Sequence, residues 1–235
     1  MSDGAVAGSW ARIVATLKER TPASARWING PADAGTLERL RSEIGLPLPP
    51  DLTEWLSLAN GAAPRFDALI IPRFMPYDAD RIIAANRMHH QIYAGSGALG
   101  TPGQPAGTET DGWWPEEYRL FIPVATDGGG HRLVVDLRDG DLRGCVMEWK
   151  QDGGLAACWP GIAVMLADIA GALEHGRRHA GLAELRPGAG PCPASRDSGL
   201  GAQPGLPDRR TRPYPPERRG GVRAAPGTLT AIGFG

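Results

Sequence analysis

Residues 119–149, RLFIPVATDGGGHRLVVDLRDGDLRGCVMEW, decide the fold that we predict for this chain. The stretch indicates three short strands joined by two tight turns. Asp127 and the three glycines behind it form the first turn, and Asp139-Gly140 forms the second. Glycine reaches positive φ without a Cβ clash, so the chain can reverse its direction at both places.

The apolar residues of this stretch alternate with the period of a β-strand. Leu133, Val135 and Leu137 share one face of the second strand, and Met147 and Trp149 share one face of the third. Antiparallel sheets commonly bury one face and expose the other to water. The pattern therefore predicts an antiparallel meander with one buried face.

Helices are predicted before the meander from apolar stripes at i, i+3, i+4 and i+7. Ser9 is the expected N-cap of the first helix. Asp33 or Thr36 begins the second helix, and Gly45 is its expected C-cap. Asp51 begins the third, where its negative charge is favourable near the positive end of the helix dipole.

The rest of the chain is organised around the same sheet. We expect a short strand over residues 69–71, a helix over 78–93 and a long loop over 94–112. A fourth strand over 155–159 and an amphipathic closing helix from Ile162 to about Gly176 follow the meander. Four tryptophans fall on apolar faces and are predicted core residues: Trp10, Trp55, Trp149 and Trp159.

Composition changes abruptly after residue 186. Residues 187–235 hold 19 Gly or Pro, 7 Arg and 3 acidic residues, and few large apolar side chains. Such a segment cannot bury enough surface to offset its ordering entropy. We therefore predict one domain over residues 1–186 and a disordered Gly/Pro/Arg-rich tail over 187–235. The domain then holds 18 basic and 23 acidic residues, a net charge of -5.

The sequence favours a cytoplasmic protein. Its three cysteines have no CxxC spacing and make an odd count, which argues against a disulfide framework. The N-terminal residues lack the basic and apolar regions of a secretory signal. No apolar run approaches the roughly 20 residues that span a bilayer, so no membrane association is expected.

Motifs for phosphate or metal binding are incomplete. The glycines after Asp127 precede a strand and not the helix of a phosphate loop, so a hairpin turn is the better interpretation. His175 and His179 are spaced like zinc ligands, but no third ligand accompanies them. Asp136 and its neighbouring acidic residues lack the spacing of a calcium loop and are expected in a solvated turn. We expect no metal and no cofactor.

No nucleophile has a base beside it, and GxSxG is absent from the sequence, so no catalytic residue is predicted. Trp113 and Trp114 are consecutive, so in an extended segment their side chains project to opposite sides. One of them is then available as an exposed aromatic anchor, unless both pack under the long loop. The candidate partner-binding residues are Trp113, Trp114, Glu116, Glu117 and Asp127.

Two stretches together resemble the SUKH superfamily, whose best-known branch is the SMI/KNR type of fungal cell-wall assembly regulator. Residues 37–61, LERLRSEIGLPLPPDLTEWLSLANG, resemble its signature of a helix, a Gly-x-x-Leu-Pro elbow and a closing Asn-Gly. Residues 122–136, IPVATDGGGHRLVVD, resemble its strand, glycine turn and aliphatic strand that ends in Asp. The resemblance covers roughly residues 10–176.

The resemblance implies an α+β fold, with a mostly antiparallel sheet packed by N-terminal and C-terminal helices. It also implies a non-enzymatic protein-binding domain, such as an immunity protein that neutralises a toxin, and the acidic domain would suit a basic toxin. Three alternatives stay open: a regulatory scaffold, an enzyme or ligand-binding protein with its site under the 94–112 loop, and weak nucleic-acid binding through the tail's arginines.

Overall fold

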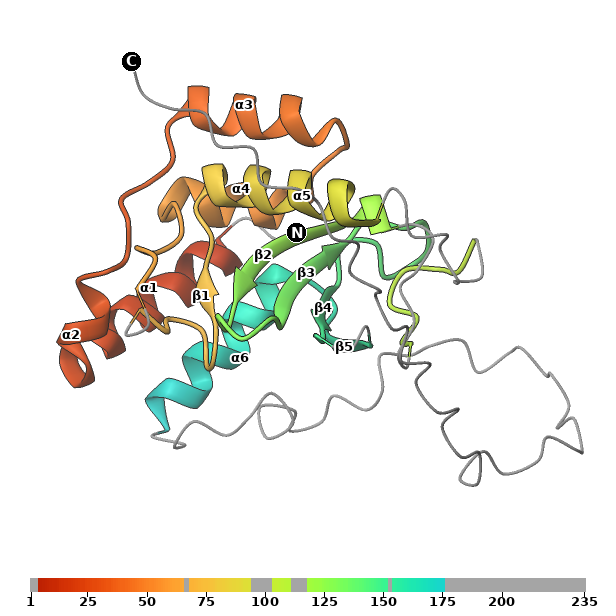
Figure 1. The fold of residues 1–235 in the computed structure, drawn as a ribbon. Coiled ribbons are helices and arrows are strands. Elements are labelled where there is room, and N and C mark those ends of the chain that lie inside the picture. Colours follow the sequence, from red (N-terminus) through yellow and green to blue (C-terminus); the bar gives the residue numbers. More distant parts are fainter. Residues whose placement is uncertain (1–3, 66–67, 94–102, 111–117, 152–153, 176–235) are drawn as a thin grey trace, which may run out of the picture. The chain divides into compact units, whose positions relative to one another are not determined.

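A computed structural model describes residues 4–65, 68–93, 103–110, 118–151 and 154–175 of the chain (Figure 1). This part contains six α-helices, one 3-10 helix and five strands. In chain order they are α1 (Ala5–Arg20), α2 (Pro22–Ala25), α3 (Ala34–Ile44), α4 (Pro50–Leu58), β1 (Met75–Pro76), α5 (Ala79–Tyr93), η1 (Tyr118–Leu120), β2 (Phe121–Thr126), β3 (Arg132–Asp136), β4 (Val146–Trp149), β5 (Leu155–Trp159) and α6 (Ile162–Glu174).

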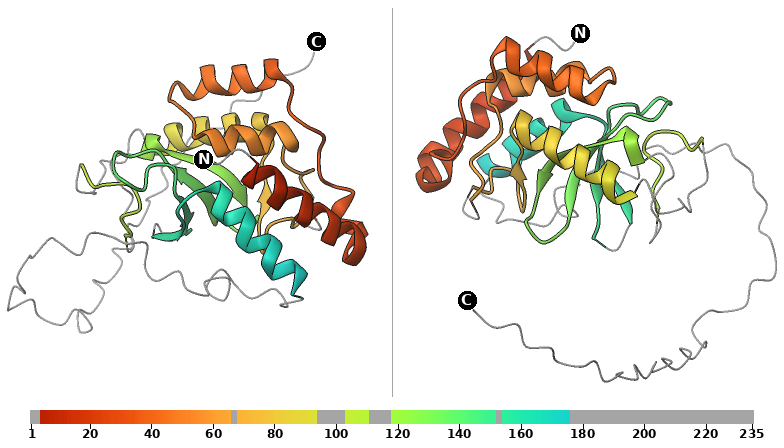
Figure 2. Two further views of the ribbon diagram at one scale, coloured as in Figure 1. Left: turned by 180° about the vertical axis from the view of Figure 1, so that it is seen from behind. Right: turned by 45° about the horizontal axis from the view of Figure 1, so that its top comes forward.

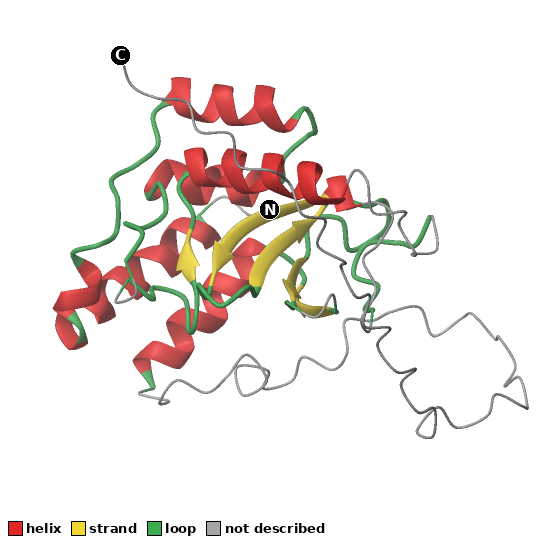
Figure 3. Ribbon diagram, viewed as in Figure 1, coloured by secondary structure: helices red, strands yellow, loops and turns green. Residues whose placement is uncertain are grey.

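The five strands form one antiparallel sheet in the order β1-β2-β3-β4-β5 (Figure 3). Phe121 of β2 lies opposite Asp136 of β3, and Leu133 of β3 lies opposite Glu148 of β4. The predicted meander and the α+β class are therefore confirmed, as is the predicted strand over 155–159, which is β5.

The predicted strand over residues 69–71 is wrong. Ile70 and Ile71 are buried, but their apolar run serves the core without a ladder of strand bonds. The chain turns back at once, since Arg73 has a φ of 69° and Ile71 makes a single bridge with Phe74. The strand instead comes later, as β1, which pairs with the end of β2.

The sheet is covered on both faces, so the expectation of one buried face is wrong. α1, α4 and α6 pack on the face that carries Leu133 and Val135. α5 crosses the other side of the sheet, as Figure 1 and the reverse view at the left of Figure 2 show. There Val134, Met147 and Trp149 form a second apolar cluster. Both sets of alternating residues are apolar, which is the pattern of strands buried on both faces.

The helix ends agree with the sequence except at Ser9. Asp33 caps α3 by accepting a hydrogen bond of 2.6 Å from the Thr36 N–H, and Gly45 ends the helix in the left-handed conformation. α1, however, begins at Ala5, and Ser9 is buried within it. The predicted core tryptophans, Trp10, Trp55, Trp149 and Trp159, are all buried.

Candidate functional site

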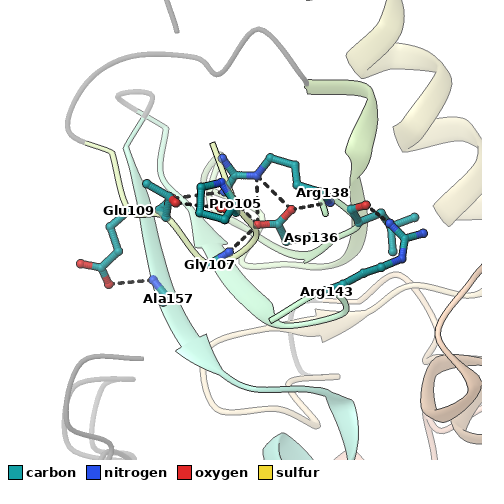
Figure 4. Close-up of polar contacts among 9 residues, drawn as sticks. Pro105, Gly107, Glu109, Asp136, Arg138, Arg143 and Ala157 are labelled. Atoms are coloured by element: carbon teal, nitrogen blue, oxygen red, sulfur yellow. Dashed lines mark hydrogen bonds and ion pairs between the residues drawn. The ribbon is translucent and has the colours of Figure 1, made fainter. Parts of the chain in front are cut away.

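A short segment, residues 103–110, lies along the outer edge of the sheet (Figure 4), and we call it the strap. Thr110 and Leu155 exchange backbone hydrogen bonds of 3.0 and 2.9 Å. The Glu109 carboxylate accepts a hydrogen bond of 2.9 Å from the Ala157 N–H. The outward N–H groups of these two β5 residues are thereby satisfied, which protects an edge that could otherwise pair with another chain.

The strap is fixed to the sheet through a buried ion pair (Figure 4). The side chains of Asp136 and Arg138 are 0% and 1% exposed, and an Nη2–Oδ2 contact of 2.8 Å joins them. The same carboxylate accepts a 2.8 Å bond from the Gly107 N–H, and Arg138 donates to the Thr108 carbonyl at 3.3 Å. The expectation of a solvated turn is therefore wrong for Asp136.

Arg143 holds the connection from β3 to β4 against the helical layer. Its guanidinium donates to the Leu137 carbonyl and, over 3.4 Å, to the Pro47 carbonyl. The Gly144 N–H donates to the Asp136 carbonyl at 2.7 Å. Asp136, which anchors the strap, is therefore itself held in position by the loop that follows β3.

Four of the predicted partner-binding residues, Trp113, Trp114, Glu116 and Glu117, lie outside the described residues. The structure does show what fixes the two ends of their segment. Thr110 is bound to β5, as above, and Tyr118 of η1 is buried with its ring edge-on to His90, 6.0 Å between centroids. The described residues on either side of this segment, Thr110 and Tyr118, therefore lie at β5 and at the start of β2.

The fifth candidate, Asp127, lies in the β2–β3 turn. Its carboxylate accepts hydrogen bonds from the N–H groups of Gly129 (2.7 Å) and His131 (3.0 Å). Those donors serve the turn, as the hairpin interpretation requires. Asp127 lies at the opposite end of β2 from Tyr118, and six strand residues span roughly 20 Å. The structure therefore does not bring Asp127 close to Tyr118, where the described chain resumes.

Asn60 and Gly61 join two parts of the fold. The Asn60 side-chain oxygen accepts a 2.8 Å bond from the Ala79 N–H, at the start of α5. Gly61 has a φ of 65°, and a Cβ placed on it would lie 2.4 Å from backbone atoms of Tyr77 and Asp78. No residue with a side chain fits there without a backbone shift.

Sequence reasoning missed the role of Arg138. The signal was present, because Asp136 and Arg138 are of opposite charge and two positions apart, which places them on one side of an extended chain. Their contact with the strap could not be predicted from spacing, since Gly107 lies 29 positions before Asp136.

The described residues hold no group of three or more His, Cys, Asp or Glu that could bind a metal ion. Within the same part of the chain, no helix is long and apolar enough to cross a membrane.

The chain was compared with known protein families. Residues 31–168 match the model of the SMI1 / KNR4 family (SUKH-1). The match includes α3 to β5, the strap and most of α6, and it begins after α1. A search of the curated proteins found no match.

Proposed function

The chain belongs to the SMI1 / KNR4 family (SUKH-1), and from this premise we propose that it is a non-enzymatic protein-binding domain. The proposal is based on the family match and on the finding that the signature residues stabilise the fold. The side-chain oxygens of Asn60, Asp127 and Asp136 accept hydrogen bonds from backbone N–H groups of the domain. Gly61 lies where any side chain would collide with the backbone. That supports a function that depends on the outer surface.

We further propose that the partner is a basic toxin domain, which the chain neutralises as an immunity protein. Residues 1–186 carry a net charge of -5, and opposite charge between partners speeds their encounter. Many bacterial members of the superfamily that the sequence resembles look like immunity proteins, which supports this choice. The protein is then expected to act in the cytoplasm of the cell that it protects.

The candidate contact segment is residues 111–117, with Trp113 and Trp114 as aromatic anchors and Glu116 and Glu117 as the charges that meet a basic partner. Thr110 and Tyr118 anchor both flanks of this segment on the domain. Anchored flanks reduce the entropy that the segment loses when a partner binds.

Co-expression of the full chain with the toxin-like product of a neighbouring gene tests the proposal. We expect co-purification at low salt and rescue of growth. The charge-reversed Glu116→Lys/Glu117→Lys variant should lose both effects. Glu19→Lys/Glu38→Lys makes the same charge change at exposed residues of α1 and α3, and should keep them. Failure of the wild-type chain to retain any polypeptide at low salt would refute the proposal.

A retained partner that is not a toxin would instead support the regulatory scaffold of the cell-wall-regulator type.

A further inference from the structure

Five side chains lie where α5 crosses the sheet: Asn86, His89 and Trp149 are buried, and His90 and Arg132 are half-buried. α5 lies on the side of the sheet opposite α1 and α6 (Figures 1 and 2). Asn86, His89 and His90 come from one turn of α5, and Arg132 and Trp149 come from β3 and β4. We call these five residues the α5–sheet cluster.

The contacts within the α5–sheet cluster centre on His89, whose pKa responds to the charge of Arg132. The His89 ring lies 5.1 Å from the Trp149 ring, measured between centroids. Arg132 is the register partner of Trp149, so their side chains project from the same face of the sheet. Asn86 precedes His89 by three positions and His90 by four, which places it on the same side of the helix. Asn86, His89 and Trp149 are each at most 3% exposed.

Three polar atoms of the cluster are buried and have no hydrogen-bond partner among the described residues. They are Oδ1 of Asn86, Nε2 of His90 and Nε of Arg132. Each such atom costs about 1–3 kcal/mol when it is left unsatisfied, and most buried polar groups in proteins are satisfied. Three of them, from two facing elements, indicate a place where a further polar molecule binds.

The α5–sheet cluster is positively charged. Arg132 is a permanent cation, and no Asp or Glu belongs to the cluster. Burial, followed by the charge of Arg132, lowers the pKa of His89 to about 3. Burial and the charge of Arg119 lower the pKa of His90. Both imidazoles are therefore neutral at physiological pH, and the positive charge of the cluster belongs to the guanidinium of Arg132.

We propose that the α5–sheet cluster binds a small oxyanion that also carries a hydroxyl group, such as hydrogen phosphate or a hydroxycarboxylate. The anion balances the charge of Arg132 and accepts its Nε–H. The Nε2–H of a neutral His90 donates to the same anion, and the hydroxyl group donates to Oδ1 of Asn86. This binding site is independent of the proposed partner surface, and neither depends on the other.

Histidine NMR on the full chain tests the proposal, with inorganic phosphate as the probe and ionic strength held constant with sodium chloride. The chain has five histidines, so the imidazole signals can be assigned by single substitutions. We expect saturable shifts of the His89 and His90 signals and a higher pKa of His90, because a bound anion stabilises its charged form. The signal of His175, at the end of α6, is the internal reference and should not move. A second titration should show that lactate binds and that propionate, which lacks the hydroxyl group, binds less well.

Arg132→Gln should weaken phosphate binding by at least about tenfold, as expected when a charged hydrogen-bond donor is lost. Arg87→Gln removes an exposed arginine of the same helix α5 and should leave phosphate binding unchanged. If Arg132→Gln does not fold, Asn86→Leu replaces it, and that variant should lose the preference for lactate over propionate. Equal shifts at all histidines, no saturation, or full binding by Arg132→Gln would each overturn the proposal.

Discussion

At the scale of the residue, the fold depends on positions whose steric requirements cannot be recognised in the sequence pattern. Gly45 and Gly61 both adopt the left-handed conformation and both follow a helix. Nothing lies within 4 Å of a Cβ placed on Gly45, whereas the same atom on Gly61 would collide with the backbone before α5. The two glycines therefore separate the cost of a strained φ from the cost of a steric clash.

We expect Gly61→Ala to destabilise the domain by about 2–5 kcal/mol, the sum of left-handed strain and overpacking. Gly45→Ala carries the strain alone and should cost about 1–2 kcal/mol. Urea unfolding of both variants measures the difference. Equal losses would show that the backbone beside Gly61 moves aside at no cost.

His89 should make the domain less stable in mild acid. Its pKa falls from 6.5 to about 3 on folding, so between these values the unfolded chain binds a proton that the folded chain does not. This contribution to stability is present above pH 6.5 and is lost as the pH falls toward 3. Between pH 7 and pH 5 the loss is about 2 kcal/mol.

Urea unfolding at pH 7 and pH 5, in buffers without phosphate, checks this sign. The His89→Phe variant should lose about 2 kcal/mol less stability between pH 7 and pH 5 than the wild-type protein. His131→Phe, the same replacement at a half-buried histidine in the β2–β3 turn, should retain it. An unchanged decline in His89→Phe would contradict the prediction.

At the scale of the element, the strap shows how one segment can secure a sheet edge. Its backbone and the Glu109 side chain satisfy the outward N–H groups of Leu155 and Ala157, and the ion pair of Asp136 and Arg138 holds it in place. The two parts of the strap therefore have separable roles. Gly107 and Thr108, which bind the ion pair, contribute to stability, and Glu109 and Thr110, which cover the β5 edge, prevent self-association.

Arg138→Leu should destabilise the domain by about 3–5 kcal/mol, because it leaves the Asp136 carboxylate buried without its counter-charge. Arg39→Leu removes the arginine of an exposed ion pair with Asp80, and should cost at most about 1 kcal/mol. Chemical denaturation compares the two. A small loss for Arg138→Leu would mean that the buried carboxylate finds another partner or a proton.

Thr110→Pro should cause self-association. Proline has no N–H to donate to the Leu155 carbonyl, so the β5 edge becomes available to a second chain. Thr110→Ala keeps both backbone bonds and should stay at the mass of the wild-type protein. Light scattering over a range of concentrations distinguishes these outcomes, and a Thr110→Pro protein with unchanged mass would argue against this role of the strap.

Elements with a local cause could be predicted from the sequence. The meander follows from period-two alternation and glycine turns, and α3 follows from Asp33 and Gly45. The predictions for Ser9 and for residues 69–71 failed because burial in the core overrode local propensity. The role of Asp136 could not be predicted, since it depends on contacts with a segment about 30 positions earlier. Of the candidate site, the structure places Asp127 alone.

At the scale of the whole molecule, the helical layer on one side of the sheet joins the two ends of the domain. α1 packs along α6, and Arg12 binds the Glu174 carboxylate through contacts of 2.7 and 2.5 Å. Arg20 donates to the last carbonyls of α6, those of Leu173 and Glu174, at 2.6 and 2.9 Å. The family match begins after α1, so this closure adds a helix outside the matched region.

We expect that deleting residues 187–235 leaves the thermal midpoint of the domain nearly unchanged, because the composition of this segment cannot support a packed core. Differential scanning calorimetry of the full chain and the truncated chain checks this. A drop of many degrees would show that the segment docks on the domain.

The pairing of the first helix with the last has a consequence for protein synthesis. Arg12 and Glu174 are 162 positions apart, so at about 5–20 residues per second a ribosome needs roughly 8–32 seconds to supply the partner of α1. Throughout that interval the apolar face of α1 in the nascent chain is exposed to water or to a chaperone. Translation speed, and not only sequence, should therefore influence how much of this protein a cell recovers in native form.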